Sequence, residues 1–202
     1  MALACSGVLG CGAAGSDATP GGGTDAGEVM TFDATPPMGA CNAVVQEHAI
    51  EGFTHVDVCS LVTYETKPPS SGNHYAVWAA FQSYPDPIPE GFWVHNLEHG
   101  AVVFSYNCPD GCASDVAAAE ALIEGLTPDP LCDPSVGDPP TRMLMTPDPN
   151  LDVRFAASSW GWTLRADCFD PATFGAFVQA HYGNGREVIC TNGDVPPSCG
   201  DP

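Results

Sequence analysis

The sequence predicts an α+β fold: a single disulfide-stapled domain with a mainly antiparallel sheet and two or three short helices. Three observations support this prediction. Segments with strand patterns and helix patterns are mixed along the chain, without the regular βαβ alternation that indicates a parallel sheet. Gly and Pro account for 22 and 20 of the 202 residues, which indicates short elements separated by many turns. Beyond residue 40 the cysteines form an even set that fits four disulfides: Cys41, Cys59, Cys108, Cys112, Cys132, Cys168, Cys190 and Cys199.

The first half of the expected domain contains strand and loop patterns. Residues 53–64 (FTHVDVCSLVTY) are rich in β-branched and aromatic residues and predict one or two strands. Residues 67–72 (KPPSSG) must form a loop. His74, Trp78 and Phe81 have helical spacing, which predicts a helix over 74–83. Residues 101–106 (AVVFSY) predict a buried strand.

The second half adds helices and further strands. We expect a helix capped by Ser114 and ending near Leu126, because VAAAEALIEGL has high helix propensity. The Pro- and Asp-rich residues 127–140 predict an irregular loop, and residues 142–146 and 153–164 predict strands. Asp170-Pro171 is typical of a helix start, and Gly183 of its end.

The chain divides into three parts. Residues 1–11 are small and apolar, as in the remnant of an export signal, and Val8–Cys11 resembles the lipobox of bacterial lipoproteins, with Ala2–Cys5 as a second candidate. Residues 12–40 have the Gly-rich, acidic composition of a flexible tether. Residues 41–200 form the expected domain. Membrane attachment is therefore expected only through a lipid on Cys11 or Cys5.

Charge and cysteine content limit the function. Asp and Glu number 25 against 5 Lys and Arg, a formal net charge of −20, so the basic surface that nucleic acids require is absent. The ten cysteines indicate an oxidising compartment outside the cytoplasm, and the lack of any Cys-x-x-Cys pair disfavours zinc-ribbon and thioredoxin folds. Proximity alone suggests Cys108–Cys112 and Cys190–Cys199 as disulfides. The other pairings stay open.

The histidines provide the candidate chemistry. In Val94–Gly100 (VHNLEHG), His95 and His99 lie four residues apart. On a helix their side chains would be ~6 Å apart and could share a metal ion, whereas on a strand they would be ~13 Å apart and could not. A site therefore requires residues 95–99 to be helical or tightly turned, with Gly100 suited to end the turn. Further candidate ligands come from outside this pair: His74, His55, Glu98 and the thioether of Met145.

Three blocks make the sequence resemble a bacterial family, domain of unknown function 3105. The blocks are PPSSGNHY (68–75) with Trp78, VHNLEHGAVV (94–103) with Tyr106, and TPDP (146–149) followed by SWG (159–161) and the Phe174–Phe177 segment. His55 also falls where members often place a histidine. Asn73, Trp162 and the extra cysteines depart from the family pattern. The resemblance implies an exported or membrane-attached protein but no defined activity.

Three functions are compatible with the sequence. The first is an exported metal-binding protein of the cell envelope, with copper on His74, His95 and His99 and with His55 or Met145 as fourth ligand. The second is a zinc hydrolase, since His95-x-x-Glu98-His99 has the inverzincin order with Glu98 as general base. The third is a metal-free interaction domain. The sequence favours binding over enzymatic turnover and predicts a metal ion as partner.

Overall fold

The structure is a computed structural model of the 202-residue chain, and it describes residues 41–199. The expected export signal (1–11) and tether (12–40), including Cys5 and Cys11, lie outside the described residues. The described residues contain a five-stranded sheet, three α-helices and a separate pair of two-residue strands.

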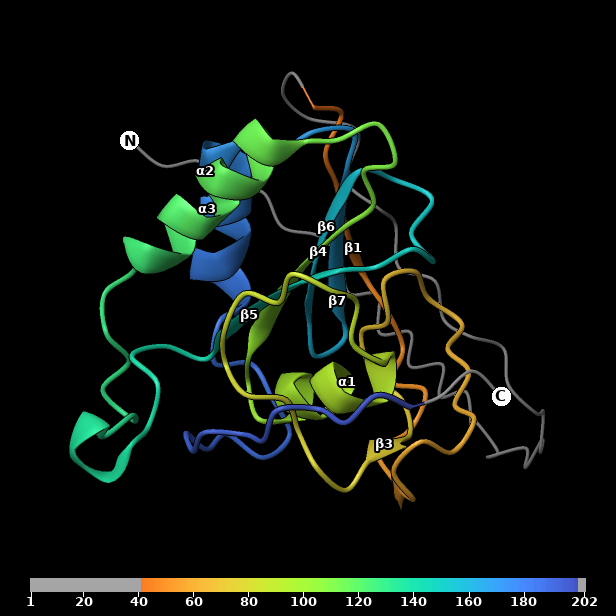
Figure 1. Cartoon of the computed structure of the whole chain (residues 1–202), viewed down its shortest axis with the longest axis vertical. Coiled ribbons are helices and arrows are strands. Elements are labelled where there is room, and N and C mark those ends of the chain that lie inside the picture. The colour runs from red at the N-terminus through yellow and green to blue at the C-terminus, as the bar shows by residue number, and fades with distance from the viewer. Residues whose placement is uncertain (1–40, 200–202) are drawn as a thin grey trace, which may run out of the picture.

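The central sheet has the strand order β1-β7-β6-β4-β5 (Figure 1). Its strands are β1 (Val44–Glu47), β4 (Val102–Tyr106), β5 (Met143–Pro147), β6 (Phe155–Ser159) and β7 (Trp162–Ala166). Every neighbouring pair is antiparallel except β4 and β5, which are parallel. The prediction of an α+β fold with a mainly antiparallel sheet is therefore confirmed.

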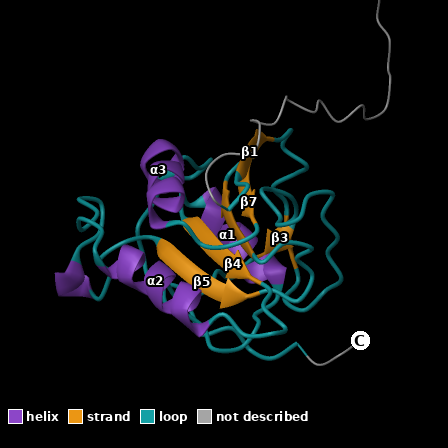
Figure 2. Ribbon diagram, turned by 90° about the horizontal axis from the view of Figure 1, so that it is seen from above, coloured by secondary structure: helices purple, strands orange, loops and turns teal. Residues whose placement is uncertain are grey.

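The two faces of the sheet pack against different helices. Side chains alternate along a strand, so Val102 and Phe104 point to one face and Val103 to the other. The first face packs against α2 (Ala113–Glu124) and α3 (Pro171–His181). The second packs against α1 (Glu90–Glu98), whose Phe92, Trp93, Val94 and Leu97 are fully buried. Figure 1 shows α2 and α3 grouped apart from α1 and β3, and Figure 2 shows the helices and the sheet from above.

The regular elements with strong local patterns were predicted well. The strands expected at 101–106 and 142–146 are β4 and β5, and residues 153–164 contain β6 and the start of β7. The last helix begins as expected, because the Asp170 side chain accepts a hydrogen bond from the Thr173 N–H. The helix expected from Ser114 is α2, but its N-cap residue is Cys112 and Ser114 lies inside it. Residues 134–136 form a 3₁₀ turn in the predicted irregular loop.

One local prediction before residue 90 was wrong. Residues 53–64 contain one short strand, β2 (His55–Val56), within the expected one or two. The expected helix over 74–83 is absent, and β3 (His74–Tyr75) lies at its start. The backbone N–H of His74 donates to Thr54 O and that of Ala76 to Val56 O, at 3.1 and 3.3 Å. These hydrogen bonds hold the segment extended. The i, i+4, i+7 spacing of His74, Trp78 and Phe81 therefore does not correspond to one face of a helix.

Four disulfides join all eight cysteines of the described residues: Cys41–Cys168, Cys59–Cys199, Cys108–Cys112 and Cys132–Cys190. The predicted Cys108–Cys112 pair is confirmed, whereas the predicted Cys190–Cys199 pair is wrong. Proximity in sequence failed there because each of these two cysteines bonds a distant segment. Four disulfides indicate an oxidising environment outside the cytoplasm. Among the described residues, no helix combines the length and apolarity needed to span a membrane.

Candidate metal centre

Two of the candidate histidines are register partners in the short parallel pair. His55 of β2 lies opposite His74 of β3, which places the two imidazoles side by side. Gly72 shapes the turn before β3 with φ +125°, and a Cβ there would lie 2.8 Å from the Tyr64 ring. The carbonyl oxygen of Gly72 accepts a hydrogen bond from Nδ1 of His74 at 2.8 Å, so the turn also orients this imidazole.

The other candidate residues lie at the end of α1. His95 and Glu98 belong to the last turn of the helix, and His99 is its C-cap residue. Gly100, at φ +83°, lets the chain leave the helix directly for β4. The requirement that residues 95–99 be helical or tightly turned is therefore met.

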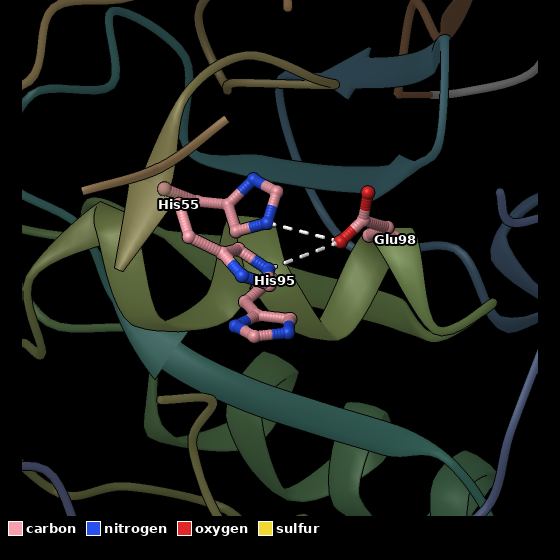
Figure 3. A group of neighbouring side chains, drawn as sticks. His55, His95 and Glu98 are labelled. Carbon is pink, nitrogen blue, oxygen red and sulfur yellow. Dashed lines mark hydrogen bonds and ion pairs between the residues drawn. The ribbon is translucent and has the colours of Figure 1, made fainter. Parts of the chain in front are cut away.

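His55, His74, His95 and Glu98 each offer a ligand atom, and these four atoms lie within 4.8 Å of one another. Oε2 of Glu98 lies 3.1 Å from Nε2 of His74 and 3.6 Å from Nε2 of His55 (Figure 3). His74, His95 and Glu98 are buried, whereas the side chain of His55 is 47% exposed. This arrangement could hold one metal ion, with His55 on its exposed side.

Hydrogen bonds define which imidazole nitrogens are available. Nδ1 of His95 lies 2.7 Å from the Tyr75 carbonyl oxygen and therefore carries the proton, which leaves Nε2 with a lone pair. Both nitrogens of His74 face oxygens, Gly72 O on one side and Glu98 Oε2 on the other. A neutral imidazole has one N–H, so only one of these two contacts can be a hydrogen bond.

The site keeps its buried imidazoles neutral. Burial lowers the pKa of His95 to about 3, and the neighbouring His99 and His74 act in the same direction. Burial also lowers the pKa of His74, although the Gly72 carbonyl and Glu98 oppose this effect. Neutral imidazoles are the form that binds metal ions, so at neutral pH these ligands need not lose a proton first.

Two predicted ligands lie away from the four-residue group. His99 belongs to a second group with Glu98 and Glu187, although its ring centroid is only 4.6 Å from that of His95. Met145 lies in the apolar core that packs against α2 and α3, on the face of the sheet opposite α1. The structure therefore does not bring the thioether of Met145 to the histidines.

Sequence reasoning missed Arg186 and Glu187, which follow α3. Nη1 of Arg186 lies 3.1 Å from Oε1 of Glu98, and the backbone N–H of Glu187 donates to the Glu98 carbonyl oxygen at 2.9 Å. The C-terminal segment that carries them crosses α1 in Figure 1. Nothing in their spacing links them to the histidines. Only the unusual position of one of the chain's few cations beside an acidic residue could have drawn attention to them.

The zinc hydrolase hypothesis requires His95 and His99 to bind the same ion. It also requires Glu98 to act as a general base without being a metal ligand. Among residues 41–199, the two groups that could hold an ion divide these histidines between them, and Glu98 is a member of both. A buried carboxylate already among the imidazoles suits a ligand or an ion-pair partner more than a base that activates water.

The fold and the site together define the class: a disulfide-rich α+β domain with a cluster of three histidines and one carboxylate, buried except for His55, that could hold a metal ion. The chain belongs to the family described as "Protein of unknown function (DUF3105)", which matches residues 55–192 and confirms the resemblance. Neither curated proteins nor solved structures gave a match. The matched range includes every residue of the cluster.

Proposed function

We propose that this protein binds a divalent transition-metal ion outside the cytoplasm, with His55, His74, His95 and Glu98 as ligands and Cu²⁺ as the preferred ion. The contact between Nε2 of His74 and Oε2 of Glu98 carries the proposal. When the single proton of a neutral His74 is on Nδ1, the lone pair of Nε2 faces the carboxylate oxygen of Glu98, and the two repel each other. A cation bound between them replaces this repulsion with two coordinate bonds.

The donor set supports Cu²⁺ over Cu⁺. Three imidazoles and a carboxylate are borderline to hard ligands, whereas Cu⁺ prefers thiolates and thioethers. The eight cysteines of residues 41–199 are in disulfides, and Met145 lies across the sheet. For a nitrogen and oxygen site, affinity among divalent first-row ions is highest for Cu²⁺. The role that follows is copper binding or delivery in the cell envelope, with Zn²⁺ as the competing ion.

A metal titration tests this proposal. The full chain, stripped with a chelator, is titrated with Cu²⁺ and its bound copper is measured after gel filtration. The fluorescence of Trp78, whose ring lies 5.1 Å from that of His95, reports binding at the same time. We expect one tightly bound ion and at least about 100-fold weaker binding in His95→Ala.

The matched control is His48→Ala, because His48 hydrogen-bonds to Thr163 and belongs to neither candidate group. This variant is expected to retain the wild-type copper content. Unchanged copper content in His95→Ala would show that the ion binds elsewhere. Absence of binding in the folded wild type would favour the metal-free interaction domain.

We also propose that the protein is held at the membrane by a lipid on Cys11 or Cys5. The lipobox-like Val8–Cys11 supports Cys11 as the modified residue. Metabolic labelling with a radioactive fatty acid in a bacterial host tests this. We expect label in the wild type and none in a Cys5→Ser, Cys11→Ser double variant, while label retained in the double variant would contradict it.

A further inference from the structure

The carboxylate of Glu98 faces two different environments. Oε2 lies toward His74 and His55, whereas Oε1 lies 3.1 Å from Nη1 of Arg186. The side chain is 1% exposed, so both oxygens are held by protein groups rather than by bulk water. A carboxylate with its two oxygens turned to opposite sides can bridge two cations.

Glu98 also lies beside His99 and Glu187. Ligand atoms of these three residues lie within 4.8 Å of one another. His99 is 3% exposed, its ring packs on Trp78 and His95, and neither ring nitrogen has a hydrogen-bond partner among residues 41–199. A buried imidazole is normally hydrogen-bonded, so this one has a nitrogen available for a ligand beside two carboxylates.

Arg186 neutralises the same two carboxylates. Its Nη1 lies 3.1 Å from Oε1 of Glu98 and 2.8 Å from Oε1 of Glu187. The side chains of Arg186 and Glu187 are 43% and 49% exposed, so the guanidinium can turn into solvent without unpacking the core. The carboxylates therefore have a counterion that is attached to the protein but can be displaced.

We propose that Glu98, His99 and Glu187 form a second divalent-cation site, with Glu98 bridging it to the histidine site and Arg186 competing for it. The donor set of one imidazole and two carboxylates suits Zn²⁺ or Mn²⁺. Because an incoming ion must displace Arg186 and lies close to the first ion, the second site binds more weakly than the first. This inference depends on the proposed function only through the shared Glu98.

Substitution of Arg186 tests the competition. In Arg186→Gln the two carboxylates lose their counterion, and we expect the second Zn²⁺ to bind at least about 10-fold more tightly than in the wild type. Calorimetric titration with Zn²⁺ gives the two affinities, and zinc content after gel filtration gives the stoichiometry. The control is Arg154→Gln, since the Arg154 guanidinium bonds the Gly111 carbonyl oxygen instead.

Two further variants locate the second ion. Adding Glu187→Gln to Arg186→Gln is expected to reduce the zinc content from two ions to one. In a His55→Ala, His74→Ala, Arg186→Gln variant we expect one ion to remain, held by Glu98, His99 and Glu187. Far-ultraviolet circular dichroism confirms that each variant is folded.

The outcomes separate the two proposals. Equal second affinities in wild type and Arg186→Gln, or a second ion that persists after Glu187→Gln, would overturn the second site. Zinc content unaffected by His55→Ala and His74→Ala would instead contradict the histidine site while leaving the second site supported.

Discussion

The two faces of the central sheet differ in how they are built. The face under α2 and α3 is covered by a continuous apolar cluster that includes Phe104, Phe155 and Phe174. The face under α1 combines an apolar cluster with four buried polar residues: His95, Asn96 and Glu98 of the helix and its C-cap residue His99. The first face therefore mainly stabilises the fold. Part of the buried surface of the second face consists of polar groups, which need hydrogen-bond or ion partners. If this distinction is right, substitutions on the two faces should separate stability from metal binding.

The largest effect on stability is expected from the apolar face. Phe104 is 1% exposed and packs against Phe169 and Phe174, so Phe104→Ala should lower the free energy of unfolding by about 3–5 kcal/mol. Urea denaturation of the metal-free protein measures this. The folded variant should keep its Cu²⁺ affinity.

A control, Val136→Ala at a side chain that is 74% exposed, should change stability by less than about 0.5 kcal/mol. A loss of copper affinity in folded Phe104→Ala would show that the two faces are coupled.

The reverse pattern is expected on the α1 face. An ion that binds only the folded state stabilises it by about 2.7 kcal/mol at a free concentration 100 times its dissociation constant. Added Cu²⁺ should therefore raise the melting temperature of the wild type and of Phe104→Ala, but not that of His95→Ala. Differential scanning calorimetry with and without Cu²⁺ measures the shift. An undiminished shift in His95→Ala would contradict the ligand assignment.

Acid should destabilise the metal-free protein through the same face. The pKa of His95 is lowered to about 3 and that of His99 to about 4, both chiefly by burial, so between these values and about 6.5 the unfolded state binds more protons. Stability should fall as pH drops from about 6.5 toward 4, by up to about 1.4 kcal/mol per pH unit for each histidine.

Urea denaturation at pH 7.5, 6 and 5 gives this slope, and His99→Asn should have a shallower one. Comparing the two proteins cancels opposing contributions from groups that both contain, such as Asp148, whose pKa burial raises. Parallel slopes for wild type and His99→Asn would exclude a contribution from His99.

The smallest effect is expected at Met145. This residue is 1% exposed in the apolar cluster, and Met145→Leu conserves its volume, so stability should change by less than about 1.5 kcal/mol. Copper affinity should not change, because the side chain lies across the sheet from the histidines. A clear drop in Cu⁺ or Cu²⁺ affinity would restore the thioether as a ligand.

Local patterns predicted the parts of the fold whose structure depends on neighbours in sequence. Strands β4 and β5, helix α2 and the Asp170-capped helix α3 all follow from hydrophobic runs, helix propensity or capping. Predictions failed where pairing with a distant segment overrides local preference. Residues 74–75 are extended because they pair with 55–56, and Cys190 and Cys199 bond Cys132 and Cys59 rather than each other.

Residue types and local spacing already specify the chemistry of the site and one part of its geometry. His95, Glu98 and His99 had to lie on one turn if they were to act together, and α1 with its C-cap provides that turn. The chain's acidity likewise led us to expect no nucleic-acid partner, and its cysteine content indicated an oxidising compartment. These properties are local or additive, so they can be read without knowledge of long-range contacts.

Which of the candidate residues converge depends on long-range packing. It placed His55 opposite His74, moved Met145 to the other face of the sheet, and brought Arg186 and Glu187 to Glu98 from 88 and 89 positions further along the chain. The physical reason is that strand register and the path of the C-terminal segment depend on how the whole core packs. No spacing within a single segment carries that information.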